Sequence, residues 1–223
     1  GVYYGMIRTP EGKLGSRSGH DAAADDLLDR YRELFAKDWL AARPDGLAPY
    51  HRETCERLAV AALKLFVLAK RREDTIVFDP DAAWQETLPR LSRLLAARAL
   101  VEDATWRSDD GRPARPPNTG AKAQRAAREL ALAINGLPRA FERGLQRRDS
   151  SELVGYLDDL SRKAALASRA GALTPRFAAA LGIAVRNGLW ALGVDLPSSA
   201  RELPPCLQGQ RRSGGDERVG GAR

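Results

Sequence analysis

Apolar residues recur at intervals of three and four positions through most of this chain. Between residues 24 and 43, the first such series comprises Leu27, Leu28, Tyr31, Leu34, Phe35 and Trp39. This spacing places the side chains on one face of an α-helix. Similar spacing predicts further helices over residues 52–70, 82–105, 121–134, 137–147, 151–170 and 175–192. No alternation of strands and helices accompanies them, so the sequence predicts an all-α helical bundle rather than an α/β domain.

Proline and capping residues mark the expected boundaries of these helices. Thr174 followed by Pro175 is a typical start for the last helix. Pro89 falls inside the third predicted helix and is expected to kink or divide it. Residues 107–120 contain three prolines and no apolar period, which predicts a linker. Residues 198–223 are rich in Pro, Gly, Ser and Arg, and we expect a disordered basic tail there.

The segment before the first helix has a different character. Residues 2–7 are mostly β-branched or aromatic, which indicates a strand, and residues 12–19 form a loop rich in Gly, Lys, Ser and Arg. Such a loop can hold phosphate, because glycine lets backbone N–H groups approach an anion and Lys or Arg supplies charge. A flexible surface turn is the alternative. The chain begins within this strand, and with Gly instead of Met, so we expect a preceding domain that the loop serves.

The balance of charge favours an anionic partner. Lys and Arg total 36 against 29 Asp and Glu, which gives a formal net charge of +7. Nucleic acid is the first candidate partner, and a merely solvated Arg-rich surface is the alternative. Lys122, Arg125 and Arg128 recur every three residues and so fall on one side of a predicted helix. Among aromatic residues that could stack on unpaired bases, Trp106 is the better candidate, whereas Trp190 follows the apolar period of the last helix and is expected in the core.

Composition also limits the other classes of function. Cys55 and Cys206 are the two cysteines, and two do not form a disulfide framework, which favours a reducing cytoplasm. His51 and Cys55 are four residues apart, but a metal site needs more ligands than these, so none is expected. No apolar run is long enough for a membrane span and no signal peptide is visible. We therefore expect a cytoplasmic protein without a membrane partner.

Several short motifs follow one another along the chain. They are Tyr-Gly-Met-Ile at 4–7, Gly-Lys-Leu-Gly-Ser-Arg-Ser-Gly at 12–19, Asp-Leu-Leu-Asp at 26–29, Ala-Ala-Leu-Lys-Leu-Phe at 61–66, Lys-Arg-Arg-Glu-Asp at 70–74, Val-Phe-Asp-Pro-Asp at 77–81, Leu-Pro at 137–138, Tyr-Leu-Asp-Asp-Leu at 156–160 and Val-Arg-Asn-Gly-Leu-Trp-Ala-Leu-Gly-Val at 185–194. In these motifs and their order, over most of residues 2–197, the chain resembles the C-terminal half of arginyl-tRNA synthetase, a class I aminoacyl-tRNA synthetase. The resemblance implies the KMSKS catalytic loop of the class, followed by the helical anticodon-binding domain called DALR.

The resemblance also implies roles for individual residues. In the family, the lysine and hydroxyl residues of the loop hold the phosphates of ATP, bound with Mg²⁺, while the adenylate forms. Lys13, Ser16 and Arg17 would take this role here. The loop departs from the family pattern, since Leu14 stands in place of Met, Gly15 in place of Ser and Ser16 in place of the second Lys. The expected partner is tRNA, and its candidate contacts are Trp106, Arg112, Arg115, Lys122, Arg125, Arg128, Arg186 and Asn187.

One motif of the family is missing from the sequence. Class I synthetases carry a His-x-Gly-His motif in a nucleotide-binding α/β domain, whereas neither His20 nor His51 lies in such a motif. We therefore expect the chain alone to hold no cofactor, and to ligate arginine only with a catalytic half encoded upstream or separately. The expected domains are a catalytic remnant at 1–23, a DALR-type domain at 24–197 and the tail at 198–223. The alternatives are a stand-alone helical module that binds RNA or protein, and a regulator that competes for tRNA.

Overall fold

The computed structural model describes residues 7–9, 12–13, 24–42, 48–77, 79–109, 120–197 and 207. Within them the chain forms seven helices and three very short strands, two strands before the first helix and one between the second and third helices. The elements are β1 (Ile7–Thr9), β2 (Gly12–Lys13), α1 (Ala24–Ala42), α2 (Pro49–Leu68), β3 (Ile76–Val77), α3 (Pro80–Asp109), α4 (Ala121–Asn135), α5 (Leu137–Arg147), α6 (Ser151–Arg169) and α7 (Pro175–Ala191). The all-α bundle predicted from the apolar period is confirmed.

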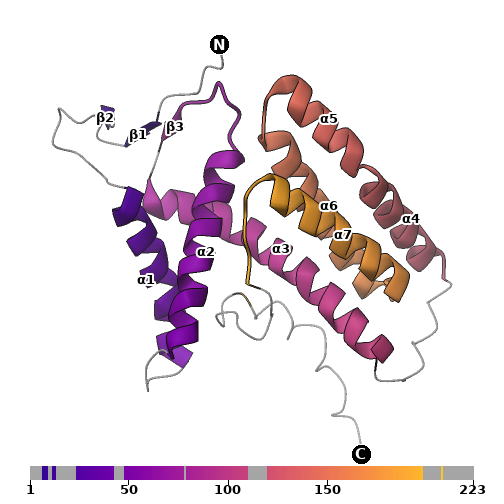
Figure 1. Cartoon of the computed structure of the whole chain (residues 1–223). Helices are drawn as coiled ribbons and strands as arrows, with labels where there is room; N and C mark the ends of the chain where they lie inside the picture. The colour runs from indigo at the N-terminus through magenta and orange to yellow at the C-terminus, as the bar shows by residue number, and fades with distance from the viewer. Residues whose placement is uncertain are drawn as a thin grey trace, which may run out of the picture.

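The long helix α3 joins the two sides of the bundle. Helices α1 and α2 pack against each other on one side of it, and α6 and α7 pack against it on the other (Figure 1). Helices α4 and α5 cover α6, and α4 also contacts α7. The apolar face of each helix is thereby buried against at least one other helix, as an amphipathic helix requires in water.

Aromatic and leucine side chains fill the space between the helices. Tyr31 and Phe35 of α1 are buried, and both contact the indole of Trp84 in α3, with ring centroids 5.6 and 4.7 Å apart. Most of the other large side chains that are fully buried are leucines of α2, α3, α4, α6 and α7, namely Leu58, Leu65, Leu91, Leu94, Leu130, Leu157, Leu160 and Leu181. These positions are those that the three- and four-residue spacing of the sequence picks out.

A small sheet links the front of the chain to the segment after α2. Its strand order is β2-β1-β3, with β1 antiparallel to β2 and parallel to β3. Ile7 is in register with Ile76, and Ile76 is buried. The described part of the front segment is therefore joined by backbone pairing to the helical part of the chain.

Helix α3 departs from the sequence prediction at two places. It runs from Pro80 to Asp109 as one helix, so Pro89 does not divide it, and the alternative expectation of a kink at Pro89 stays a prediction. A proline removes one hydrogen bond and crowds the preceding turn. Burial of Leu91 and Leu94 just beyond Pro89 favours the continuous helix. The predicted linker at 107–120 also begins too early, because residues 107–109 are helical; most of its remaining residues lie outside the described part.

One capping prediction and one helix start that was not predicted can be read directly from the structure. The Thr174 hydroxyl accepts a hydrogen bond from the backbone N–H of Phe177 at 3.3 Å, as expected for the residue before α7. Helix α2 begins at Pro49, earlier than predicted, and His51 Nδ1 accepts the Ala48 N–H at 3.2 Å. The buried His51 thus serves the start of a helix.

Two further expectations concern the C-terminal tail and membrane-spanning helices. The predicted disordered tail lies outside the described residues except for Leu207, whose side chain is buried. Of the helices that the structure describes, none combines the length and the apolar character needed to cross a membrane.

Candidate nucleic-acid interface

The predicted phosphate loop is described only at its edge. Lys13 is the last residue of β2, and its Cα is paired with that of Arg8 in β1. The side chain of Lys13, and the whole of Ser16 and Arg17, lie outside the described residues. The role of these three residues at ATP stays a prediction.

The structure places three of the predicted RNA contacts on the surface of α4. Lys122, Arg125 and Arg128 are exposed, whereas Ala123 and Leu130 of the same helix are buried. We refer to Lys122, Arg125 and Arg128 as the basic stripe. Arg125 Nε lies 2.9 Å from Oε1 of Glu129, which partly neutralises the middle of the stripe. Lys122 and Arg128 make no ion pair with any described residue, so their charge is available to a partner.

Other predicted contacts near the linker are not located. Trp106 lies in α3, but its side chain is outside the described residues. Arg112 and Arg115 are outside them altogether.

Helix α7 corrects the prediction for its tryptophan. Arg186 and Asn187 are exposed, as a binding role requires. Trp190 was expected in the core, but 82% of its surface is exposed, and Ile183 is 52% exposed. The buried face of α7 is formed by its other apolar residues and its small ones: Ala178, Leu181, Ala184, Val185, Gly188 and Leu189. Trp190 follows Leu189 by one residue, which turns it about 100° away from that face.

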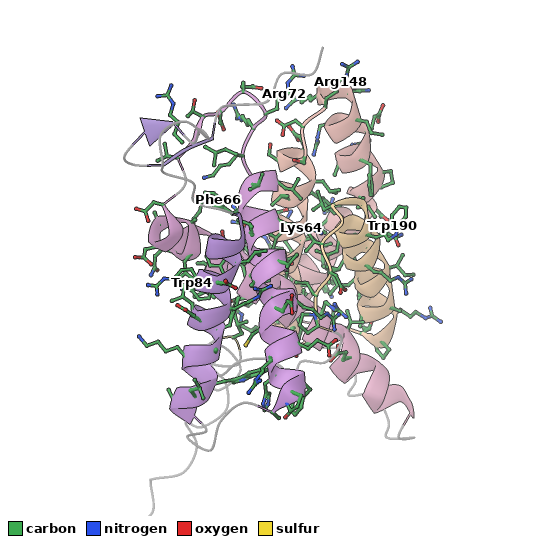
Figure 2. The ribbon with its side chains drawn as sticks, turned by 60° about the vertical axis from the view of Figure 1, so that its left-hand side comes forward. Lys64, Phe66, Arg72, Trp84, Arg148 and Trp190 are labelled. Carbon is green, nitrogen blue, oxygen red and sulfur yellow. The ribbon has the colours of Figure 1, made fainter. Side chains whose placement is uncertain are left out.

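A cavity of about 820 Å³ opens beside Trp190, between α3, α7 and the segment that follows α7. Its apolar lining includes Val101, Ile183, Leu189 and Val194. Cationic lining comes from Arg57, Arg98 and Arg186, against the carboxylates of Glu102 and Asp195. We refer to this space as the Trp190 cavity; Figure 2 shows Trp190 on the outer side of α7.

Three basic side chains hold the segment 193–196 that forms one wall of the Trp190 cavity. Arg57 donates to Oδ2 of Asp195 at 3.1 Å and to the carbonyl of Leu196 at 3.0 Å. Arg98 donates to the same carbonyl at 2.8 Å, and Lys64 Nζ donates to the carbonyl of Gly193 at 2.6 Å.

These bonds give Lys64, Arg57 and Arg98 a structural task, because they satisfy carbonyls that follow the end of α7. Arg186 is different: within the described part of the chain it makes neither a hydrogen bond nor an ion pair.

A second group of cations lies where α2 ends and α5 meets α6. Ser150 donates a hydrogen bond to the carbonyl of Leu68 at 3.0 Å, which brings Arg72 and Arg148 to the same end of the molecule (Figure 2). Arg147 and Arg143, however, both pair with Glu152. The charge at this end is therefore partly neutralised within the chain, and the basic stripe and Arg186 are the stronger candidates for anion binding.

Comparison with known proteins decides which family these helices belong to. The arginine–tRNA ligase of Treponema pallidum is 30% identical over 171 residues, which cover 72% of this chain and 28% of that protein. The ligase of Treponema denticola is 27% identical over 169 residues, covering 71% and 28%. The chain is homologous to part of arginyl-tRNA synthetase. The ligase of Halobacterium salinarum matches over a longer stretch, 26% identical over 210 residues and covering 87% of this chain and 32% of that protein. No protein-family model matches the chain.

The fold agrees with a solved member of the arginyl-tRNA synthetases. The enzyme from Thermus thermophilus superposes with a TM-score of 0.65 at 16% sequence identity, covering 87% of this chain and 34% of the solved one. At this identity the likeness concerns the fold alone. The chain spans roughly a third of the length of the arginyl-tRNA synthetases that it matches.

Sequence reasoning missed Trp190 as a surface residue of this synthetase-related chain. A signal for it was present, because Ile183, Arg186 and Trp190 recur at intervals of three and four and so share one side of α7. The apolar spacing of α7 favoured the core assignment instead, since a tryptophan at the end of a helix is compatible with either the buried or the exposed face.

Proposed function

We propose that this chain is the tRNA-binding part of an arginyl-tRNA synthetase-like protein, in the manner of a DALR anticodon-binding domain. The observation that carries the proposal is the homology to arginine–tRNA ligases over 72% of the chain. Residues 24–197 would form the anticodon-binding domain, residues 1–23 the edge of a catalytic domain, and residues 198–223 a basic tail. The cytoplasm is the expected location.

The distribution of charge supports a polyanionic partner. The exposed Lys122 and Arg128 of the basic stripe and the unpaired Arg186 on the neighbouring helix present positive charge without a compensating carboxylate from the described residues. Phosphate contacts of this kind supply most of the affinity of proteins for nucleic acid and position them on it. Asn187 adds an amide that can donate or accept beside Arg186.

Ligation of arginine would need a catalytic half in addition to these residues. Lys13, Ser16 and Arg17 would then face the phosphates of ATP, and ATP with Mg²⁺ would belong to that assembled site. The chain alone is proposed to bind tRNA and not to activate arginine.

A gel-shift titration with tRNA at rising salt tests the proposal. We expect the chain to retain tRNA at low salt and to lose affinity steeply as salt increases, because each phosphate contact releases counterions. Reversal of the basic stripe (Lys122→Glu, Arg125→Glu and Arg128→Glu) should weaken binding and reduce the slope of log affinity against log salt by up to about three.

The matched control reverses three exposed cations on the α1–α2 side, Lys37→Glu, Arg52→Glu and Arg71→Glu. This control changes the net charge equally and should leave most of the affinity. Equal losses in the two triple variants would mean that overall charge, and not the stripe, attracts tRNA. No shift of tRNA at low salt would overturn the proposal itself.

A stand-alone module that binds a protein is the second candidate. Exposed large apolar side chains favour it, among them Leu132 on α4 and Leu145 on α5. Such side chains, when grouped, mark protein-binding surfaces. The same titration separates the two functions, since the protein-binding alternative predicts no salt-dependent tRNA shift.

A further inference from the structure

We infer that Trp190 is the stacking platform for one unpaired nucleobase of the bound RNA, and that Arg186 contacts the phosphate next to that base. This inference rests on the proposed tRNA-binding function and names the part of the RNA that one surface of the chain would take. It gives a task to a residue that the sequence placed in the core.

The exposure of Trp190 is the first observation. An indole is the largest apolar side chain, and 82% of the surface of Trp190 is exposed to solvent. The six buried residues of α7 form one face of the helix, and Trp190 does not belong to this buried face. Together with the exposed Ile183 and the apolar wall of the adjoining cavity, this ring forms a grouped apolar surface, and such surfaces mark binding sites. Single-stranded nucleic acid binds proteins through such surfaces, because every base has a flat face that can stack on an aromatic ring.

The space beside Trp190 has the chemistry of a nucleotide site. The Trp190 cavity measures about 820 Å³ and is walled by Val101, Ile183, Leu189 and Val194. This volume lies in the usual range of sites that hold small organic groups. The apolar walls suit the faces of a base but offer nothing to a sugar–phosphate backbone, which must therefore lie at the charged rim.

The rim carries more cations than anions, with three arginines against Glu102 and Asp195. Arg57 and Arg98 are held by Asp195 and the Leu196 carbonyl, so they fix the wall and leave Arg186 to reach a phosphate. Arg186 precedes Trp190 by four residues and so lies one turn away on the same side of α7. A guanidinium one turn from an indole can contact the phosphate that flanks a stacked base.

The same chemistry selects unpaired bases over duplex RNA. Bases inside a duplex are already stacked on their neighbours, so a protein aromatic residue reaches only bases in loops, bulges and ends. A second macromolecule, an apolar protein segment, would use the apolar walls without needing Arg186. The excess of cations favours the nucleotide.

Anisotropy titrations of fluorescently labelled tRNA with three variants test the inference. We expect Trp190→Leu to weaken tRNA binding about tenfold, Trp190→Phe to stay within about threefold of the natural chain, and neither to change the salt slope, because stacking involves no counterion release. Arg186→Gln should reduce the salt slope by about one. Both positions, Trp190 and Arg186, are exposed, so the three variants should keep the fold, which circular dichroism checks.

A matched aromatic control and a duplex RNA complete the experiment. Tyr50→Leu removes another exposed aromatic ring, on α2, and should leave tRNA affinity unchanged. Binding of a fully paired RNA should be the same for Trp190→Leu and the natural chain. The inference is overturned if Trp190→Leu binds tRNA as tightly as the natural chain. It is also overturned if Trp190→Phe and Trp190→Leu weaken tRNA binding by the same factor. If the natural chain binds tRNA and the Trp190 variants bind it with the same affinity, only this inference is overturned. If the natural chain does not bind tRNA at low salt, the proposed function is overturned as well.

Discussion

Gly188 of α7 lies directly against Leu157 of α6: a methyl group added at Gly188 would come within 2.6 Å of Leu157 Cδ2 and 3.2 Å of Cδ1. Leu157 is fully buried, so it has little room to withdraw. The absence of a side chain at Gly188 therefore sets how closely the last helix approaches α6, and with it the position of Arg186 and Trp190 on the outer side.

We predict that Gly188→Ala lowers the free energy of unfolding by about 1–3 kcal/mol, because overpacking a close helix contact forces side chains or backbone to shift. Urea denaturation followed by circular dichroism measures this. Gly155→Ala in α6 is the control: nothing lies within 4 Å of the added methyl group, and the change should stabilise the helix by about 0.5–1 kcal/mol. If both variants were equally stable, the close contact at Leu157 would not be what Gly188 provides.

Asp158 should contribute more to stability than its neighbour Asp159. Asp158 accepts a hydrogen bond from Nε of Arg93 in α3 at 2.7 Å, and its side chain is only 16% exposed. The ion pair therefore joins α3 to α6 in a partly buried environment. Asp159 is 45% exposed and pairs with Lys163 of its own helix. We expect Asp158→Asn to destabilise by about 1–2 kcal/mol and Asp159→Asn by less than about 0.5 kcal/mol. Thermal unfolding measures the loss of stability in each variant. Equal losses would mean that the Arg93–Asp158 pair between α3 and α6 does not stabilise the fold.

The stability of the fold should decrease at alkaline pH, and Tyr31 should account for part of the decrease. Burial, and to a lesser degree the carboxylate of Glu86, raises the pKa of Tyr31 to about 12 from its ordinary value of about 10. A raised pKa means that the folded state holds the phenolic proton more tightly than the unfolded state does. The resulting stabilisation is complete below pH about 10 and is lost as the pH rises to about 12.

Tyr31→Phe removes this titration. Its free energy of unfolding should fall less steeply than that of the natural chain between pH about 10 and 12. At neutral pH it should be equal or slightly higher, since the Tyr31 hydroxyl is buried and has no hydrogen-bond partner among the described residues. Burial also raises the pKa of Cys55 to about 11 and that of Tyr156 to about 12, so part of the alkaline loss should remain. Tyr50→Phe changes an exposed ring and should not alter the profile; identical slopes for Tyr31→Phe and the natural chain would contradict the prediction.

Local sequence signals predicted the helices well, because they depend on neighbours in the chain. The bounds of α5 agree with the apolar period to the residue, and Thr174 caps α7 as its position before Pro175 predicts. Long-range pairing was not predictable in this way. The parallel register of Ile7 with Ile76 joins residues 69 positions apart, and no local pattern in either strand specifies it.

The candidate site shows the same division. The spacing of Lys122, Arg125 and Arg128 was enough to predict one exposed side of α4, because a face rich in alanine and leucine lies opposite. The exposure of Trp190 was missed, since the period of α7 offers two faces and only packing on α3 and α6 decides which is buried. Likewise, the sequence alone does not show that Arg57 and Arg98 bind the segment 193–196 whereas Arg186 does not. Only the structure shows that Arg57 and Arg98 donate to the carbonyl of Leu196.

The sequence by itself determined the helical bundle, its approximate boundaries, the basic character of its surface and the family it resembles, because periodicity, capping and motif order are properties of residues close together in the chain. The tertiary structure decided which of the described cations pair within the chain, as Arg57 and Arg98 do, how closely α7 approaches α6 at Gly188, and that Trp190 faces water. These depend on contacts between helices that are distant in sequence, where burial and shape, rather than local preference, set the outcome.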